Sequence, residues 1–267
     1  MRSIKKLINM EDRIILLTGG GGKIAYAIAE AFAEMNAKIL LIDNNNESLT
    51  RSQEMLTEKF STECDILQID LENLENEKGA IIKILNKFEK LDVLVNCAAL
   101  VGTSQLKGWS TDFINQSIVT WRRAMEVNLN SIFLLSQICF PYLRSSGNGS
   151  IINIASTYGI VGPDWKMYED TSYSNPAAYA ASKGGLIQLT KWLASTLAPN
   201  IRVNTMSPGG VFREHDDTFH QRYNERTPLK RMANEEDFKG AALYLGSDLS
   251  AYVTGHNLVV DGGWTAI

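Results

Sequence analysis

Four consecutive glycines, residues 19–22, join a short apolar run to a segment with helical spacing. The run before them, Arg13 to Thr18, is rich in apolar and β-branched residues and predicts a buried strand. The segment after them, 24–35, carries small and apolar residues at helical spacing and predicts a helix. Because glycine permits a sharp turn and a close approach of the backbone, this unit favours a parallel sheet wrapped by helices.

The same alternation of strand and helix continues along the whole chain. Further strands are predicted at 38–43, 66–70, 93–96, 150–155, 201–205 and 257–260, and further helices at 47–59, 78–90, 118–143, 176–197 and 235–245. We therefore predict an α/β fold, a Rossmann-like, doubly wound and mainly parallel sheet of about seven strands with helices on both faces. We expect residues 1–10 to form an N-terminal extension and residues 11–267 a single domain. Two stretches, 101–117 and 159–175, fit no regular element and are typical of functional loops.

The composition argues against several kinds of partner. The 267 residues carry a formal net charge of −4 without a basic block, which argues against nucleic acid. No apolar run approaches the ~18 residues of a membrane span, and residues 1–10 lack the apolar core of a signal peptide. Cys64, Cys97 and Cys139 are far apart, and neither they nor the three histidines show disulfide or zinc spacing. We expect a cytoplasmic protein that binds no metal and no membrane.

The glycine turn has the context of a dinucleotide-binding fingerprint, between a strand and a helix. The N-terminus of such a helix offers free N–H groups to a pyrophosphate. The next strand ends in Asp43, 24 residues after Gly19, where a carboxylate accepts hydrogen bonds from the adenosine ribose and repels a 2′-phosphate. Lys23 could meet such a phosphate, neutralise the pyrophosphate or face water. We predict NAD as the cofactor, preferred over NADP, because Asp43 stands directly at the strand end.

Tyr179 and Lys183 are four residues apart on a predicted helix, so they lie on one face. A nearby ammonium favours the phenolate and lowers the pKa of a tyrosine toward neutrality. The pair, with Ser156 and Asn128 upstream of it, therefore predicts an acid/base that moves a hydroxyl proton at physiological pH.

Several motifs in a single order carry a resemblance to a known family. They are the glycine turn at 18–25, Asp70 after the third strand, Asn96-Cys97-Ala98-Ala99, Asn128, Ser156, Tyr179 with Lys183, Ser207-Pro208-Gly209 and Asp261-Gly262-Gly263. From about residue 11 to residue 267, the chain resembles the single-domain short-chain dehydrogenase/reductases. The resemblance implies an NAD(P)-dependent oxidoreductase that interconverts a secondary alcohol and a ketone.

The resemblance also implies roles for individual residues. Tyr179 would donate or accept the proton, Lys183 would hold the nicotinamide ribose, and Ser156 would hydrogen-bond the reacting oxygen. Asn128 would anchor a water that links Lys183 to solvent. The implied cofactor contacts are Thr18, Gly19, Gly22, Lys23, Ile24, Asp43, Asp70, Leu71, Asn96, Ala98, Tyr179, Lys183, Pro208, Gly209 and Val211.

Some positions depart from the family pattern. Lys23 and Ala25 stand where the second and third glycines are usual, and the spacing resembles that of extended members that act on nucleotide sugars. This spacing leaves open a nucleotide-sugar epimerase or dehydratase that retains NAD. A non-enzymatic dinucleotide-sensing protein on the same fold is a third hypothesis. Arg213 stands where the family often has a threonine that contacts the carboxamide.

The substrate half differs from the family mainly in one loop. Ser156 and Tyr179 are 23 residues apart, a longer gap than usual, and the loop between them must lie near the site entrance. Trp165 and Tyr168 in this loop could stack on a ring or sugar face, or pack the loop down or against another subunit. With Ser156 and Arg213 they form the candidate substrate set. We expect a small, polar substrate such as a sugar.

The long loop and the segment Thr227 to Arg231 also resemble a branch linked to bacterial surface-sugar and flagellin modification. In the family, the helix at 176–197 commonly packs against its counterpart in another subunit. Small residues on this helix permit such an approach, so we expect a homodimer or homotetramer.

Overall fold

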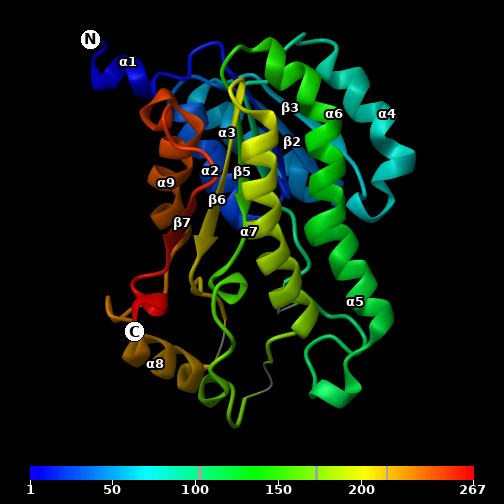
Figure 1. Ribbon diagram of the computed structural model, residues 1–267, viewed down its shortest axis with the longest axis vertical. Coiled ribbons are helices and arrows are strands. Elements are labelled where there is room, and N and C mark those ends of the chain that lie inside the picture. Colours follow the sequence, from blue (N-terminus) through cyan, green and yellow to red (C-terminus); the bar gives the residue numbers. More distant parts are fainter. Residues whose placement is uncertain (102–103, 172–173, 215) are drawn as a thin grey trace.

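The computed structural model describes residues 1–101, 104–171, 174–214 and 216–267. Across these residues seven strands form one parallel sheet in the order β3-β2-β1-β4-β5-β6-β7 (Figure 1). The strands are β1 (Ile14–Thr18), β2 (Lys38–Asp43), β3 (Cys64–Gln68), β4 (Val93–Asn96), β5 (Gly149–Ile154), β6 (Ile201–Pro208) and β7 (Asn257–Val260). The predicted doubly wound α/β sheet is confirmed.

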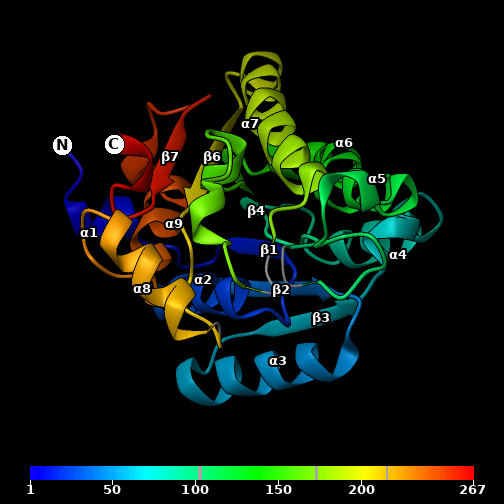
Figure 2. The same ribbon diagram turned by 90° about the horizontal axis from the view of Figure 1, so that it is seen from below.

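Helices cover both faces of the sheet (Figure 2). One face carries α2 (Lys23–Glu34), α3 (Asn46–Phe60) and α9 (Lys239–Gly246), and the other carries α4 (Leu74–Leu85), α6 (Ser131–Ser145) and α7 (Ala177–Leu197). The shorter α5 (Ile118–Met125) packs against α7.

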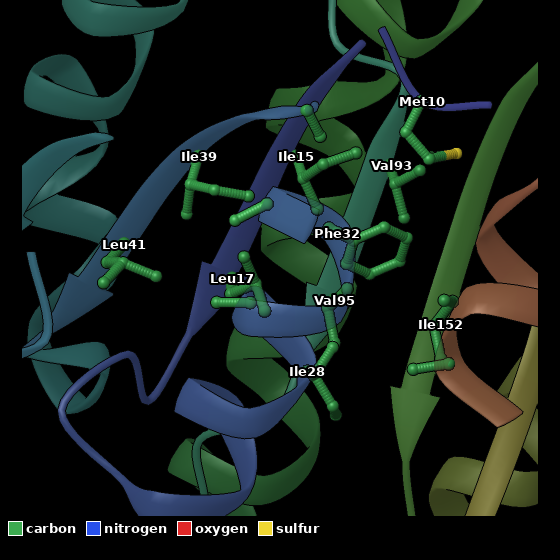
Figure 3. Packing of buried hydrophobic residues seen from close by; sticks show 14 of the residues in the cluster. Met10, Ile15, Leu17, Ile28, Phe32, Ile39, Leu41, Val93, Val95 and Ile152 are labelled. Atoms are coloured by element: carbon green, nitrogen blue, oxygen red, sulfur yellow. The ribbon is translucent and has the colours of Figure 1, made fainter. Parts of the chain in front are cut away.

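Side chains of β1 alternate between two layers of core. Ile15 and Leu17 point toward α2 and pack with Phe32 (Figure 3), whereas Ile14 and Leu16 belong to the layer under α4, α6 and α7. All five residues of β1 are buried because helices cover both faces of this central strand, which explains its continuous apolar run. Burial of each large aliphatic side chain stabilises the fold by roughly 1.5–3 kcal/mol.

The carboxyl ends of the parallel strands lie along one edge of the sheet, the lower edge in Figure 1. The strand order reverses at β1, with β2 and β3 on one side and β4 to β7 on the other. Such a switch point opens a crevice at the strand ends, where α/β proteins bind ligands. The glycine turn after β1 and the loop after β4 border this crevice.

A helical segment spans the range predicted as a helix, 118–143, but it is not a uniform α-helix. It is divided into α5 and α6 by a π-helical turn, Glu126–Asn130. A π turn holds more residues than an α turn, and such turns occur frequently at functional sites. This one contains Asn128, whose side chain is fully buried.

Other boundaries differ less. The helix predicted at 78–90 lies earlier, as α4, and the helix predicted at 235–245 begins with a 3₁₀ turn, Glu235–Phe238. Among the described residues, the α-helices outside the predicted elements are α1 (Ile4–Ile8) and α8 (Asp217–Arg226). The segment before β1 is fixed to the rest of the chain, because the Arg2 side chain pairs with Asp248 and Met10 is buried in the core.

Candidate active site

The turn after β1 packs so closely that side chains do not fit. Gly19 has a φ of +71°, and a Cβ at this position would lie 2.9 Å from the Cα of Ala98. A Cβ on Gly20 would lie 2.6 Å from the Cβ of Leu41. The turn therefore needs glycine for both its conformation and its contacts with β2 and the loop after β4. It leads directly into α2, whose N-cap is Gly22.

A cavity of about 440 Å³ opens over this turn and is called the dinucleotide cavity below. Among the predicted cofactor residues, those that line it are Gly19, Gly22, Lys23, Ile24, Asp43, Asp70, Leu71 and Ala98. The N-terminus of α2 borders this cavity, and the first N–H groups of a helix lack intrahelical partners. The cavity can therefore receive a pyrophosphate group on one side.

Two backbone donors hold the carboxylate of Asp43 in place at the end of β2. The N–H of Gly21 donates to Oδ2 at 3.1 Å, and the N–H of Asn45 donates to Oδ1 at 3.0 Å. Each carboxylate oxygen can accept a further hydrogen bond. This corner of the cavity therefore suits hydroxyl donors and disfavours a second negative charge.

Two residues predicted to contact a cofactor instead tie the strand ends together beneath the cavity. The Oγ1 of Thr18 accepts hydrogen bonds from the N–H groups of Cys97 and Ala98 at 3.1 and 3.2 Å. Asn96 is buried, and its Nδ2 donates to the Oδ1 of Asn153 in β5 at 2.8 Å. Neither Thr18 nor Asn96 belongs to the described lining of the cavity.

A second cavity of about 280 Å³ adjoins the first and is called the substrate cavity below. Five described residues line both cavities: Ile24, Cys97, Ala99, Val101 and Arg213. The predicted site residues that line the substrate cavity are Ile24, Ser156, Tyr168, Tyr179, Lys183, Pro208, Gly209, Val211 and Arg213. A ligand that fills the dinucleotide cavity can therefore extend into the substrate cavity.

Tyr179, Ser156 and Lys183 lie together in the wall of the substrate cavity. Ser156 follows β5 and forms a hydrogen bond with Tyr179 of α7. The Nζ of Lys183 is 5.8 Å from the centre of the Tyr179 ring and donates to the carbonyl of Ile154 at 2.7 Å. A Cβ on Gly159 would lie 2.7 Å from the carbonyl carbon of Lys183, so the turn after Ser156 packs directly on α7.

Burial controls the protonation of Tyr179 and Lys183. It raises the pKa of Tyr179, and the hydrogen bond with Ser156 offsets only part of this shift. Burial also lowers the pKa of Lys183 to about 8, although the nearby Cys97 acts in the opposite direction. The predicted lowering of the Tyr179 pKa is therefore wrong for this structure, because desolvation of the phenolate dominates. At neutral pH the phenol keeps its proton and most of the lysine is charged.

Asn128 holds two segments together behind this group. Its Oδ1 accepts from the N–H of Leu100 at 2.8 Å, and its Nδ2 lies 3.1 Å from both the carbonyl of Leu100 and the Oγ of Ser182. Ser182 directly precedes Lys183 on α7, and Leu100 belongs to the loop after β4. The π turn thus links this loop to α7.

Aromatic residues that the sequence pattern did not reveal form much of the substrate cavity. Phe219 and Tyr223 reach it from α8, and the Tyr223 ring stacks on Trp264 at 4.5 Å between ring centres. The hydroxyl of Tyr223 accepts a hydrogen bond from the N–H of Gly210 at 2.5 Å. The four-residue spacing of Phe219 and Tyr223 was the available sequence signal, because it places both on one face of a helix.

The candidate substrate residues Trp165 and Tyr168 are placed differently. Tyr168 lines the substrate cavity, and its hydroxyl lies 2.5 Å from that of Tyr158. Trp165 is 56% exposed and lies tilted against Tyr168, and it is absent from the described lining of both cavities. Of the two alternatives for Trp165, packing of the loop agrees with this position. Arg213 lines both cavities and pairs with Glu235 at 2.7 Å.

The topology and the crevice define a Rossmann-type protein. Residues 21–265 match a family model described as enoyl-(acyl carrier protein) reductase. The chain is 31% identical to the post-translational flagellin modification protein A of Campylobacter coli, over 96% of this chain and 99% of that protein. It is 32% identical to the probable galactose dehydrogenase GalD of Rhizobium meliloti strain 1021, over 96% of each chain.

Solved structures agree with these matches. A short-chain dehydrogenase from Leptospira borgpetersenii with bound NAD⁺ has 33% identity and a TM-score of 0.84, over 99% of this chain and 96% of that chain. A gluconate 5-dehydrogenase from Burkholderia cenocepacia J2315 in complex with NADP and tartrate has 26% identity and a TM-score of 0.87, over 99% of this chain and 100% of that chain. The chain belongs to the short-chain dehydrogenase/reductase family.

Two further results limit the kinds of site. Within the described parts of the chain, which leave out His215, no group of three or more His, Cys, Asp or Glu side chains could hold a metal ion. No helix in the same parts is long and apolar enough to cross a membrane.

Proposed function

We propose that this protein is an NAD(P)-dependent oxidoreductase that interconverts a secondary alcohol and a ketone on a small polar substrate. The observation that carries the proposal is the position of Tyr179, Ser156 and Lys183 in a cavity that adjoins the dinucleotide cavity. Membership of the short-chain dehydrogenase/reductase family supports it. The sugar dehydrogenases among the relatives support a sugar-like substrate.

The residues of the dinucleotide cavity fit NAD. The glycine turn and the N-terminus of α2 would bind the pyrophosphate, and Asp43 would accept hydrogen bonds from the adenosine ribose. Asp70 and Leu71 would contact the adenine, and Lys183 the nicotinamide ribose. When bound, NAD accepts a hydride from an alcohol carbon or returns one to a ketone carbon.

We also propose that NAD is preferred over NADP. The carboxylate of Asp43 is fixed by Gly21 and Asn45, so it cannot easily turn away from an added phosphate. Lys23 at the same cavity is exposed and carries the opposite charge, which makes the preference one of degree.

Tyr179 is the proposed general acid and base. Burial keeps its phenol protonated at neutral pH, so it can donate the proton to a ketone oxygen, and in the reverse direction its phenolate takes the proton from an alcohol. The Ser156 hydroxyl would hydrogen-bond the same oxygen. Lys183 is mostly charged below about pH 8 and stabilises the phenolate as it forms. Asn128 would position Lys183 through Ser182.

The assembly and location of the protein follow from weaker indications. We propose a homodimer or homotetramer, because large apolar side chains are exposed on α6 and α7, among them Phe133 and Trp192. We propose the cytoplasm as its location, because Cys64, Cys97 and Cys139 are free thiols. We also propose that residues 11–267 act as one domain around the shared sheet.

Replacement of Tyr179 by Phe tests the proposed reaction. The variant should lose roughly 10³-fold in kcat/KM, because general acid–base catalysis contributes about 10² to 10⁴. Its dissociation constant for NADH should stay within about threefold of the wild-type value, since the ring remains. Activity is measured as NADH absorbance with polyols, sugars and nucleotide sugars, and binding by NADH fluorescence.

Full activity in Tyr179→Phe would contradict the proposal. A protein that keeps NAD bound and transforms nucleotide sugars without net NADH would instead be an epimerase or dehydratase. The fully exposed Tyr252, absent from both described cavity linings, provides the matched control, and Tyr252→Phe should behave as the wild type.

A further inference from the structure

Two tyrosine hydroxyls meet inside the substrate cavity. The hydroxyl oxygens of Tyr158 and Tyr168 are 2.5 Å apart, and both residues line the cavity beside Tyr179. Tyr158 comes from the turn after β5, whereas Tyr168 comes from the long loop between Ser156 and Tyr179. The loop therefore brings a second polar group to the place where the proposed acid/base lies.

The pair is fixed relative to the reacting groups. The backbone N–H of Tyr158 donates to the Oγ of Ser156 at 3.2 Å, and Ser156 forms a hydrogen bond with Tyr179. On the other side, the buried Asn175 donates a hydrogen bond to the hydroxyl of Tyr168. One continuous chain of hydrogen bonds thus runs through Asn175, Tyr168 and Tyr158.

The two tyrosine hydroxyls can still form hydrogen bonds with a ligand. Each phenol carries one donor hydrogen and two acceptor lone pairs. Whichever tyrosine donates, the bond between the two hydroxyls uses one of their two hydrogens. The other hydrogen and a lone pair of Tyr158 can therefore bind a hydroxyl group, which is both donor and acceptor.

The two positive charges in the described lining of the substrate cavity both have a role or a partner. Lys183 is buried, donates to the Ile154 carbonyl and is assigned above to the nicotinamide ribose, and Arg213 is paired with Glu235. The other polar lining groups are hydroxyls and the Asn175 amide, and aromatic rings of Phe219, Tyr223 and Trp264 form the apolar wall. A carboxylate or phosphate placed beside the tyrosine pair would lose hydration, and the two cations of the lining are assigned to the cofactor or paired with Glu235.

We propose that the substrate is an uncharged ring compound with a second hydroxyl group, and that the Tyr158–Tyr168 pair binds this second hydroxyl. The inference rests on the proposed function, because it assigns the reacting hydroxyl to Tyr179 and Ser156. It excludes sugar acids and phosphorylated sugars as preferred substrates. The aromatic wall accommodates the C–H surface of the ring, and the tyrosine pair sets specificity.

Two matched pairs of compounds test the proposal. cis-Cyclohexane-1,2-diol and cyclohexanol differ by the second hydroxyl, and D-galactose and D-galacturonate differ by a carboxylate. We expect kcat/KM with NAD to be at least tenfold higher for the diol than for cyclohexanol. Tyr168→Phe should reduce this ratio to about threefold or less, because it removes one partner of the hydroxyl. Tyr252→Phe should keep the wild-type ratio.

A binding measurement separates this proposal from the proposed function. Isothermal titration of the NADH-saturated protein should show D-galactose binding at least tenfold more tightly than D-galacturonate, even where neither is turned over. Turnover of other alcohols combined with a diol-to-cyclohexanol ratio near one would overturn the inference and leave the oxidoreductase intact. Tighter binding of D-galacturonate, no binding of either sugar, or an unchanged ratio in Tyr168→Phe would also overturn it.

Discussion

The two adjoining cavities are built in different ways. The dinucleotide cavity is formed by strand ends and a glycine turn, and the sheet fixes its shape through backbone contacts such as that of Gly19 with Ala98. The aromatic wall of the substrate cavity is formed by side chains from the loop after β5, from α8 and from the C-terminal end, which form a hydrophobic cluster of their own. Changes in the glycine turn should therefore disturb the fold and the cofactor together, whereas changes in the aromatic wall should alter specificity.

The largest effect is expected for Gly19→Ala. The added Cβ combines a positive φ with an overlap against the Ala98 backbone, so the free energy of unfolding should fall by roughly 3 kcal/mol. The NADH dissociation constant should rise more than tenfold, because the turn must move. Urea denaturation and NADH fluorescence measure the two effects.

Gly147 offers a control with the same strain and no overlap. Its φ is +77°, and a Cβ there would meet nothing within 4 Å. Gly147→Ala should cost only about 1 kcal/mol of stability, and NADH binding should not change. Equal losses in the two variants would mean that the turn is not held by its contacts.

Lys183 provides a test by pH. Its pKa is about 8 in the folded protein against 10.5 for an ordinary lysine, so the unfolded chain binds more protons between these values. The free energy of unfolding therefore rises with pH across that window. Below pH 8, the charged Lys183 in its buried position lowers this free energy by roughly 3 kcal/mol. Lys183→Met removes the titration.

The measurement is the difference in unfolding free energy between Lys183→Met and the wild type at pH 7, 8.5 and 10. Relative to the wild type, the variant should lose stability steadily as the pH rises from 8 to 10. A difference that stays constant over this range would show that Lys183 is not held in a desolvating environment.

Asp43→Ser should change cofactor preference rather than stability. Loss of the fixed carboxylate removes the repulsion of a 2′-phosphate, so the ratio of kcat/KM with NAD to that with NADP should fall at least tenfold. Asp65 on the adjacent β3 lies outside the described linings of both cavities. Asp65→Ser is therefore the control, and the ratio should stay at the wild-type value. An unchanged ratio in Asp43→Ser would locate the discrimination elsewhere.

The smallest effect is expected for Trp165→Ala. The side chain is mostly exposed and touches the outer side of Tyr168, so kcat/KM should change less than about twofold. Steady-state kinetics on the best substrate found measures it. A tenfold loss would show that Trp165 reaches the substrate, as one of the two sequence-based alternatives requires.

The sequence predicted the residues of the dinucleotide cavity better than those of the substrate cavity, and the reason is physical. Gly19 follows β1 and Asp43 ends β2, so a pattern of about 25 residues contains the requirement for a turn and a carboxylate at one sheet edge. Tyr158, Tyr223 and Trp264 are separated by many residues and meet only after the loops pack. No local pattern encodes such a meeting.

The protonation of Tyr179 shows a second limit. Its four-residue distance from Lys183 was visible in the sequence, and α7 does place the two side chains near each other. The direction of the pKa shift depends on how completely the phenol is removed from water. Spacing along a helix carries no information on that burial.

The π turn at Glu126–Asn130 has a consequence for the tolerance of the chain to length changes. The π turn holds one residue more than an α turn, so deletion of one residue inside it would leave α5 and α6 in phase. An α-helix advances about 100° per residue, so deletion of one residue from the first turn of α6 would instead rotate every later side chain of α6 by that angle. Leu135, Cys139 and Leu143, now buried against the sheet, would turn away from it. We expect α5 and α6 to accept substitutions far more readily than the gain or loss of a single residue.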